Sequence, residues 1–223
     1  MSGQVYWYIS KAKLDVLKES APRFFEGVSV KLGFKLPFVS GSLSGTDRST
    51  LIKDLERVVA KLGSDGHLKN YGEIAPDEAP VMVRFSGPAV RQADDDCFWV
   101  ASESETTAIL LAGSPGYAIG SPAGGAAAPH ISPSADPVGA IKAAFENVSG
   151  VPPVPGMSLS SRLSYVWQAI MCDALESGLT LPRVEGVAIF ASSLSADRGQ
   201  LRRVGRERIR RLVIGTPLYV RQI

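Results

Sequence analysis

The chain has 223 residues, of which 45% are hydrophobic and 21% charged, a composition that is typical of a folded globular protein. No run approaches the roughly 18 consecutive apolar residues of a membrane span, and the first ten residues lack the features of a secretory signal, so we expect a cytoplasmic protein with no membrane partner. The net charge of +2 conceals an asymmetry, because residues 198–223 carry eight arginines against one acid, Glu207, and the remaining residues therefore sum to −5.

Few residues are available for metal or covalent chemistry. The chain has two cysteines, Cys97 and Cys172, and two histidines, His67 and His130. Their spacing matches neither a disulfide framework nor a zinc site, so we expect free cysteines, no metal and no cofactor. A Ser–His or Cys–His mechanism would have to use one of these two histidines, which lie in Gly- or Pro-rich stretches.

The first elements alternate between strand and helix. Aromatic and β-branched residues predict a strand over 5–10, and the leucine spacing predicts a short helix over 11–20 that ends before Pro22. Residues 28–38 alternate strictly between apolar and polar, which predicts a long strand with one buried face. The apolar spacing within 49–63 predicts a helix that ends at Gly63.

The middle of the chain is typical of strands, and the end is typical of helices. Strands are predicted over 81–87, 97–102 and 107–113, the last two as a hairpin, and residues 121–137 have the composition of a linker or flexible loop. Helices are predicted over 137–148, 159–178, 182–196 and 199–212. Residues 212–220 are predicted to form a last strand or an extended arm.

This order favours the α+β class rather than a doubly wound α/β fold. We expect a single α+β domain over residues 1–223, strand-rich over 1–120, with a flexible loop over 121–137 and a helix-rich part over 138–223. Its sheet is expected to be antiparallel, with five or six strands and with the C-terminal helices packed on one face. The last segment is expected to return to that sheet.

One turn pattern occurs twice, in residues 110–118 and 212–220. Both stretches read as an apolar run followed by Gly, Ser or Thr, Pro, one further residue and Tyr. In one interpretation, both are strand exits with favourable turn chemistry, since Gly permits a sharp bend and Pro fixes φ. In the other, the two turns lie side by side and line a pocket, with four polar side chains facing a ligand: Ser114, Tyr117, Thr216 and Tyr219.

Other candidate motifs are incomplete. Residues 113–120 contain three glycines, but their spacing is not that of a dinucleotide-binding loop. Residues 41–45 match neither a nucleophile elbow nor a P-loop, which leaves a connecting loop or an anion site at a helix N-terminus. Asp94, Asp95 and Asp96 could bind a hard cation, but such a run is more typical of a solvated turn before a strand.

Residues 198–211 carry seven arginines and are the strongest electrostatic feature of the chain. A solvated helix that pairs with the acidic remainder or with a partner subunit is one interpretation. A small anionic ligand bound by Arg202, Arg206 and Arg210 is another, because arginine suits bidentate phosphate recognition. We expect no nucleic-acid partner, because the chain is near neutral and no aromatic residues are interleaved with the arginines.

Four sequence blocks together resemble an actinobacterial family of uncharacterised proteins, a domain of unknown function. They are "VYWYISKAKLDVL", "VKLGFKLPFVSG", the Gly-Ser-Pro turn after "AILLAG", and "LVIGTPLYV". The resemblance implies a bacterial cytoplasmic protein and implies no catalytic residues. It also implies that relatives differ in length near residues 121–137.

Three functional hypotheses follow, and the sequence assigns no catalytic residue and no oligomeric state. The first is a non-catalytic binding or regulatory module for a small anionic ligand or a partner protein. The second is a small hydrolase or transferase that does not use histidine, with a site formed by Ser10, Lys11, Arg84 and Ser114. The third is a structural or assembly protein.

Overall fold

A computed structural model describes residues 5–26, 48–74, 81–93, 97–119, 156–176, 178 and 180–223. Several sequence predictions lie outside these residues. They are the strand over 28–38, the glycine-rich loop at 41–45, the acidic run 94–96, the loop at 121–137 and the helix over 137–148.

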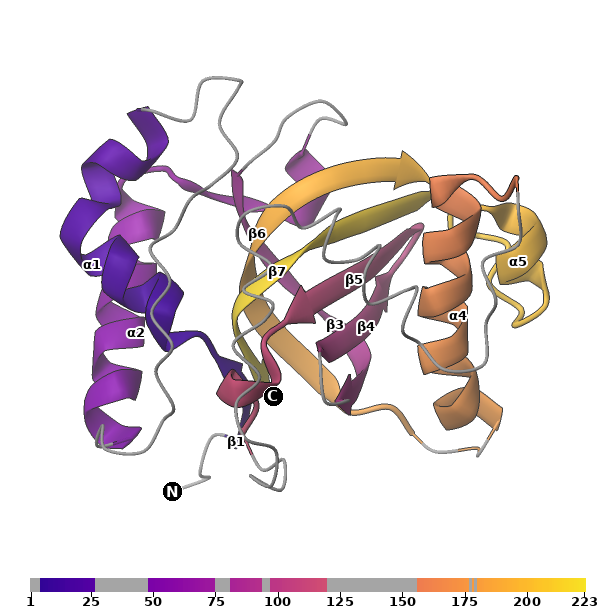
Figure 1. Cartoon of the computed structure of the whole chain (residues 1–223), viewed down its shortest axis with the longest axis horizontal. Helices are drawn as coiled ribbons and strands as arrows, with labels where there is room; N and C mark the ends of the chain where they lie inside the picture. The colour runs from indigo at the N-terminus through magenta and orange to yellow at the C-terminus, as the bar shows by residue number, and fades with distance from the viewer. Residues whose placement is uncertain are drawn as a thin grey trace.

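Within the described part of the chain, five strands close into a barrel in the order β3–β4–β5–β7–β6, with β6 returning to β3 (Figure 1). The strands are β3 (Val81–Ala93), β4 (Phe98–Ser104), β5 (Thr107–Gly113), β6 (Arg183–Ser195) and β7 (Arg211–Gln222). The β5–β7 pairing is parallel, and the other pairings around the barrel are antiparallel. Closure pairs both edges of each strand, which removes the exposed edges of an open sheet.

Two short strands extend the barrel wall. β1 (Val5–Ile9) pairs antiparallel with β7, and β2 (Leu68–Asn70) pairs parallel with β3. β6 follows one edge of β7 along its whole length, so β5 and β1 share the other edge. β5 pairs as far as Gly215 and β1 pairs from Tyr219 onward, so residues 216–218 lie between the two partners. This gap in the ladder positions the candidate site.

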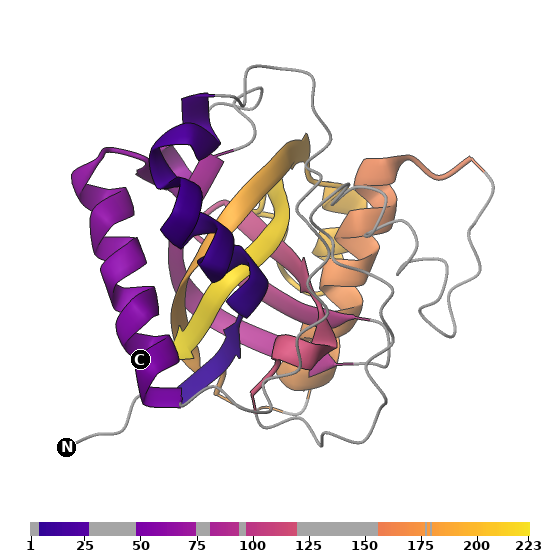
Figure 2. The ribbon, with the colours of Figure 1, turned by 60° about the vertical axis from the view of Figure 1, so that its left-hand side comes forward.

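The helices lie on opposite sides of the barrel. α1 (Lys11–Glu26) and α2 (Arg48–Ser64) cover one side, whereas α4 (Leu159–Glu176) and the short α5 (Arg198–Arg202) lie on the other (Figures 1 and 2). Two 3₁₀ turns, η1 (Tyr71–Glu73) and η2 (Pro115–Tyr117), follow β2 and β5. In the described residues, no helix combines the length and the apolar character that a bilayer span requires.

Alternation along β4 and β5 separates the barrel interior from the face that α4 covers. Trp99, Ala101 and Leu110 pack with Leu163 and Trp167 of α4. The intervening residues form a second cluster in the interior, which includes Phe85, Phe98, Val100, Ile109 and Leu111. The indole N–H of Trp167 donates to the Ser102 carbonyl at 2.9 Å, which fixes α4 on β4.

α1 and α2 share a third apolar cluster with the barrel. Leu14 and Leu17 of α1 and Leu51, Leu55 and Leu62 of α2 are buried there against Met82, Val187 and Leu218. The helical spacing of these leucines explains why the sequence predicted both helices. Docking of α1 on Leu218 brings the first turn of α1 beside the gap in β7.

The structure confirms the α+β class and corrects its arrangement. The predicted plain antiparallel sheet with helices on one face is wrong, because the sheet closes on itself and includes two parallel pairings. The part after residue 138 is not predominantly helical among its described residues, since it supplies the two long strands β6 and β7. The last segment does return to the sheet, where β7 pairs with β1, β5 and β6.

Three of the predicted helices need correction. Residues 182–196 form strand β6, and residues 199–212 form the five-residue α5, turns and the start of β7. Val184, Val187 and Phe190 of β6 are three residues apart, as on one face of a helix, but in the strand they are buried in three different apolar clusters because both faces of β6 are covered. The first helix continues past Pro22 to Glu26.

Candidate functional site

A polar centre occupies the gap between β5 and β1 on β7. Pro217 has no N–H to donate, and on this side of β7 none of the described strands pairs with residues 216–218. Lys13 fills the gap: its Nζ donates to Thr216 Oγ1 at 2.6 Å and to the Pro217 carbonyl at 2.9 Å. The backbone N–H of Ser10 donates to the Leu218 carbonyl at 2.8 Å. The gap is therefore bridged by the start of α1 instead of by a strand.

Ser10 directs the chain from β1 into α1. Its carbonyl accepts the first helical bond, from Leu14 N at 3.0 Å, and its hydroxyl lies 3.5 Å from Lys13 N, as in a helix N-cap. Lys13 therefore lies in the first turn of α1, one turn before Leu17 and on the buried side of the helix. The local sequence therefore places a lysine on the leucine-bearing face of α1, which is buried against the barrel.

The Lys13 side chain is buried, with only 4% of the residue exposed. Burial lowers the pKa of its amine from 10.5 to about 7. Lys13 forms no ion pair with a described residue. Its Nζ lies 5.9 Å from the centroid of the Tyr8 ring, at the outer limit of a cation–π contact.

Tyr8 joins the end of β5 to this centre. Its buried hydroxyl is hydrogen-bonded by the Ser114 backbone and the Ser10 side chain, and burial raises the pKa of the phenol above its usual value. Its ring stacks on Phe98 at 5.1 Å between centroids, and Tyr117 packs edge-on at 6.2 Å. Gly113 is required here, because a Cβ at that position would lie 2.7 Å from the Tyr8 hydroxyl oxygen.

Four of the residues predicted from the sequence lie around this centre: Ser10, Ser114, Tyr117 and Thr216. The two residues that connect them, Tyr8 and Lys13, were missed. Lys13 could have been noticed, because it lies four residues before Leu17 and so shares the apolar face of a predicted helix.

The other three predicted ligand-binding residues are placed differently. Tyr219 packs against Tyr6 at 6.3 Å between ring centroids, and its hydroxyl is near the charges of Arg221, Glu185 and Arg84. Arg84 is exposed on β3. Lys11 is the first residue of α1 and is half-buried.

The two copies of the repeated turn have different structures. The first ends β5 at Gly113 and continues into η2. The second is not a strand exit, because Gly215, Thr216 and Pro217 lie inside β7, which continues to Gln222. They are nevertheless connected, because Ser114 contacts Tyr8, Thr216 contacts Lys13, and Lys13 faces the Tyr8 ring.

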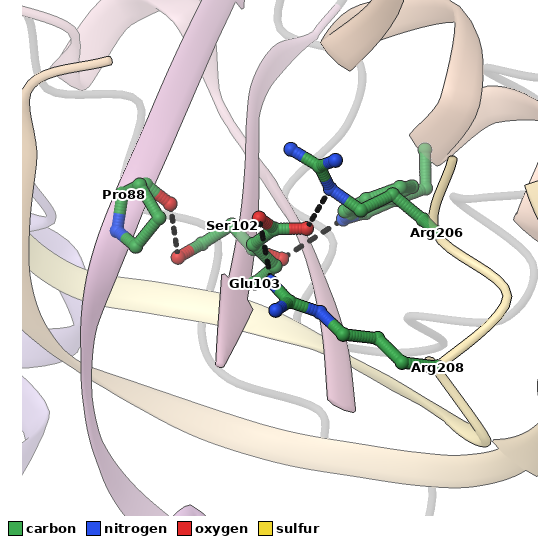
Figure 3. Close-up of polar contacts among 6 residues, drawn as sticks. Pro88, Ser102, Glu103, Arg206 and Arg208 are labelled. Atoms are coloured by element: carbon green, nitrogen blue, oxygen red, sulfur yellow. Dashed lines mark hydrogen bonds and ion pairs between the residues drawn. The ribbon is translucent and has the colours of Figure 1, made fainter. Parts of the chain in front are cut away.

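The arginine-rich segment is a capped turn that is held against the barrel. Asp197 Oδ1 accepts from the backbone N–H groups of Gly199 and Gln200 at 2.9 and 3.2 Å, which starts α5. Farther along the segment, Arg206 and Arg208 both donate to Glu103 on β4. The distance to Glu103 is 2.7 Å from Arg206 Nε and 3.4 Å from a terminal nitrogen of Arg208 (Figure 3). The continuous helix predicted over this segment is therefore wrong, whereas the predicted pairing with the acidic remainder of the chain occurs at Glu103.

The arginines of this segment fall into two groups. Arg206, Arg208 and Arg211 bind internal acceptors, which for Arg211 are the Ser193 hydroxyl at 2.6 Å and the Ile74 carbonyl at 2.9 Å. A second group is exposed: Arg198, Arg202, Arg203 and Arg210. Of the predicted anion-binding residues, Arg202 and Arg210 thus face solvent, whereas Arg206 is committed to Glu103.

Among the described residues, no cluster of three or more His, Cys, Asp or Glu side chains could hold a metal ion. No curated protein and no solved structure matches the chain significantly. None of the comparisons with known proteins addresses the actinobacterial origin that the resemblance of the sequence blocks implies, so that origin stays a prediction. Residues 4–223 match a family of unknown function, DUF7019, nearly end to end, and the chain belongs to that family.

Proposed function

We propose that this protein is a binding or regulatory module, located in the cytoplasm, with a non-catalytic site that recognises phosphate or carboxylate groups of an anionic ligand or partner. The recognition surface consists of Arg198, Arg202, Arg203 and Arg210, here called the arginine surface. The observation that carries the proposal is that these four side chains are exposed while the backbone that presents them is fixed.

The fixed backbone matters because it lowers the entropic cost of binding. The Asp197 cap holds the start of the segment, and the Glu103–Arg206 pair holds its middle. At its end, the Arg210 N–H donates to the Thr106 carbonyl at 2.8 Å and the Arg210 carbonyl accepts from Ala196 N at 2.9 Å. Arginines on a preorganised backbone lose less freedom when they bind an oxyanion.

Charge balance on this side of the molecule also supports an anionic partner. The exposed acids of the segment and of the adjoining β4–β5 turn are Glu207 and Glu105, against four exposed arginines besides Arg208, which is exposed but pairs with Glu103. The remaining positive excess attracts anions and makes their association dependent on ionic strength.

Titration calorimetry on the full chain tests the proposal, with inorganic triphosphate, a nucleoside triphosphate and a carboxylate-rich peptide as probes. The variant R202Q/R203Q is expected to weaken binding about tenfold or more, the effect of losing two phosphate contacts. The matched control is R57Q/K61Q, which removes the same charge from exposed positions on α2, on the opposite side of the barrel (Figure 1). No heat with any probe would remove the small-ligand form of the proposal.

A second candidate function, a hydrolase or transferase that does not use histidine, is favoured by the contact between Lys13 and Thr216. A structural or assembly role would be favoured by a large exposed apolar patch. The large apolar side chains that are exposed in the described residues are those of Val5 and Ile223. Sedimentation velocity on the full chain tests that role through the oligomeric state.

A further inference from the structure

Lys13 and Thr216 lie 203 positions apart in the sequence and meet in the polar centre, with Lys13 Nζ 2.6 Å from Thr216 Oγ1. Both residues are buried, with 4% and 1% exposed. The other groups near the amine are the Pro217 carbonyl at 2.9 Å and the Tyr8 ring, whose centroid is 5.9 Å away. The amine is thus surrounded by neutral groups among the described residues, and its closest partner is a hydroxyl.

Hydrogen-bond counting favours a neutral amine at this position. An ammonium group has three N–H donors, whereas the described acceptors at Lys13 are Thr216 Oγ1 and the Pro217 carbonyl. A neutral amine has two N–H groups and one lone pair. Its two N–H groups match these two acceptors, and its lone pair is available for the hydroxyl proton of Thr216 when that hydroxyl attacks a substrate. Burial acts in the same direction, because it lowers the pKa of Lys13 to about 7.

A lysine that accepts the proton of a neighbouring hydroxyl converts that hydroxyl into a nucleophile. Lysine replaces histidine as the base in some hydroxyl-dependent enzymes, so this chemistry does not need either of the two histidines of the chain. We propose that Lys13 and Thr216 form a base–nucleophile pair for acyl transfer from small uncharged esters. This activity does not depend on the arginine surface.

The aromatic surroundings of the pair favour an uncharged substrate. Tyr8 stacks on Phe98 and meets the edge of Tyr117, so the ring that lies closest to the amine belongs to an aromatic cluster. A charged acyl donor would have to lose its hydration in this place without gaining a described ion-pair partner.

The reaction balances without a cofactor. Thr216 Oγ1 attacks the ester carbonyl carbon and its proton passes to Lys13 Nζ; the intermediate then collapses, and the leaving alcohol takes that proton from the Lys13 ammonium. The acyl group is now bound to Thr216. Water or another hydroxyl compound attacks the acyl carbon and gives its proton to Lys13, and the departing Thr216 oxygen receives that proton. Each cycle restores the hydroxyl and the neutral amine.

η2 forms the entrance to the pair in this proposal. The Tyr117 hydroxyl is hydrogen-bonded by the Ala12 backbone, so η2 lies against the first turn of α1. Gly116 is exposed and Tyr117 is half-buried, in contrast to the buried Tyr8 beneath. Movement of Tyr117 away from Tyr8 would expose the centre to a small ester.

The experiment uses p-nitrophenyl acetate with the full chain. We expect a burst of p-nitrophenolate equal to the protein concentration and an acetyl group on Thr216, located by peptide mass spectrometry. The burst rate is expected to rise with pH through about 7, as the Lys13 amine loses its proton. Lys13→Met and Thr216→Val should each lower the burst rate about 100-fold or more, and Thr216→Ser should retain it. Lys18→Met is the control, because Lys18 is on the same helix and pairs with Asp54 on α2.

Three outcomes would overturn the proposal. The first is acetylation of exposed lysines alone in the wild-type chain, a result that needs no variant. The second is an unchanged burst in Lys13→Met that circular dichroism shows to be folded, as expected if the lysine only ties α1 to β7. The third is an acetyl group on Lys13, because Thr216 would then not be the nucleophile. For the entrance, Tyr117→Ala should accelerate the burst, and a rate no faster than wild type would exclude η2.

Discussion

Glu103 and Arg206, which lie 103 positions apart in the sequence, form an ion pair with 2.7 Å between Glu103 Oε2 and Arg206 Nε. The carboxylate side chain is 7% exposed and the guanidinium side chain 23%. Glu103 belongs to β4, and Arg206 to the segment that links α5 to β7. The pair therefore attaches the arginine surface to the barrel wall.

Glu103→Gln is expected to lower the free energy of unfolding by about 2 kcal/mol. The substitution leaves Arg206 and Arg208 with a neutral partner. Because both arginines are partly exposed, the loss of stability should stay below the roughly 3–5 kcal/mol of a fully buried pair. Urea unfolding measures the change. Glu207→Gln, an exposed glutamate in the same segment, should stay within about 0.5 kcal/mol of wild type. Equal effects of the two variants would mean that the buried pair contributes nothing.

The low pKa of Lys13 predicts a specific dependence of stability on pH. The folded chain releases this proton near pH 7, whereas the unfolded chain holds it until about 10.5. Between these values the unfolded state binds more protons, so a rise in pH stabilises the folded state. The free energy of unfolding of wild type minus that of Lys13→Met should therefore increase between pH 7 and 9.5, by up to a few kcal/mol. A constant difference in urea unfolding over this range would show that Lys13 titrates normally.

Gly215→Ala is expected to destabilise the protein by about 2–3 kcal/mol. A Cβ at this position would lie 2.4 Å from the Ile189 carbonyl oxygen, and this oxygen belongs to the backbone of β6 and cannot move independently. Gly63 in α2 is the matched control, because a Cβ there meets nothing within 4 Å. Gly63→Ala should stabilise by about 0.5–1 kcal/mol through helix propensity. Thermal unfolding of both variants should thus give shifts of opposite sign.

Asp197→Ala is expected to cost about 1 kcal/mol, because it removes the acceptor of the Gly199 and Gln200 N–H groups. The hydrogen bond with the Ser161 side chain is the largest cause that lowers the pKa of Asp197. The stabilisation is therefore complete above the ordinary pKa of aspartate and is lost as the pH falls through the lower pKa of the folded state. Urea unfolding at pH 7 and at pH 3 should show the difference between variant and wild type shrinking in acid. Asp65→Ala, at an exposed aspartate after α2, should show a smaller cost at pH 7.

The elements that the sequence predicted correctly share a strong local pattern. The aromatic run of β1, the leucine spacing of α2, the β4–β5 hairpin and α4 all carry a period that depends only on neighbouring residues. β6 was predicted as a helix because its apolar residues Val184, Val187 and Phe190 are three apart in the sequence, and all three are buried because both faces of the strand are covered. Burial of both faces depends on the helices and strands that pack around β6 and is therefore not a local property.

The candidate site was predictable in its hydroxyl groups but not in its amine. The repeated Gly-Ser/Thr-Pro pattern indicated Ser114, Tyr117 and Thr216, which lie at the polar centre. The position of Lys13 four residues before Leu17 was a local signal that was missed, but the burial of its amine beside Thr216 depends on a contact between residues 203 positions apart.

The sequence by itself determined three local properties: which stretches have an apolar face, where turns occur, and which end of the chain is basic. These features depend on residues a few positions apart. Only the tertiary structure decided that the strands close into a barrel, that Arg206 is committed to Glu103, and that Lys13 is buried beside Thr216. The reason is that strand pairing, burial and the pKa values that follow from burial depend on contacts between residues 100 or more positions apart.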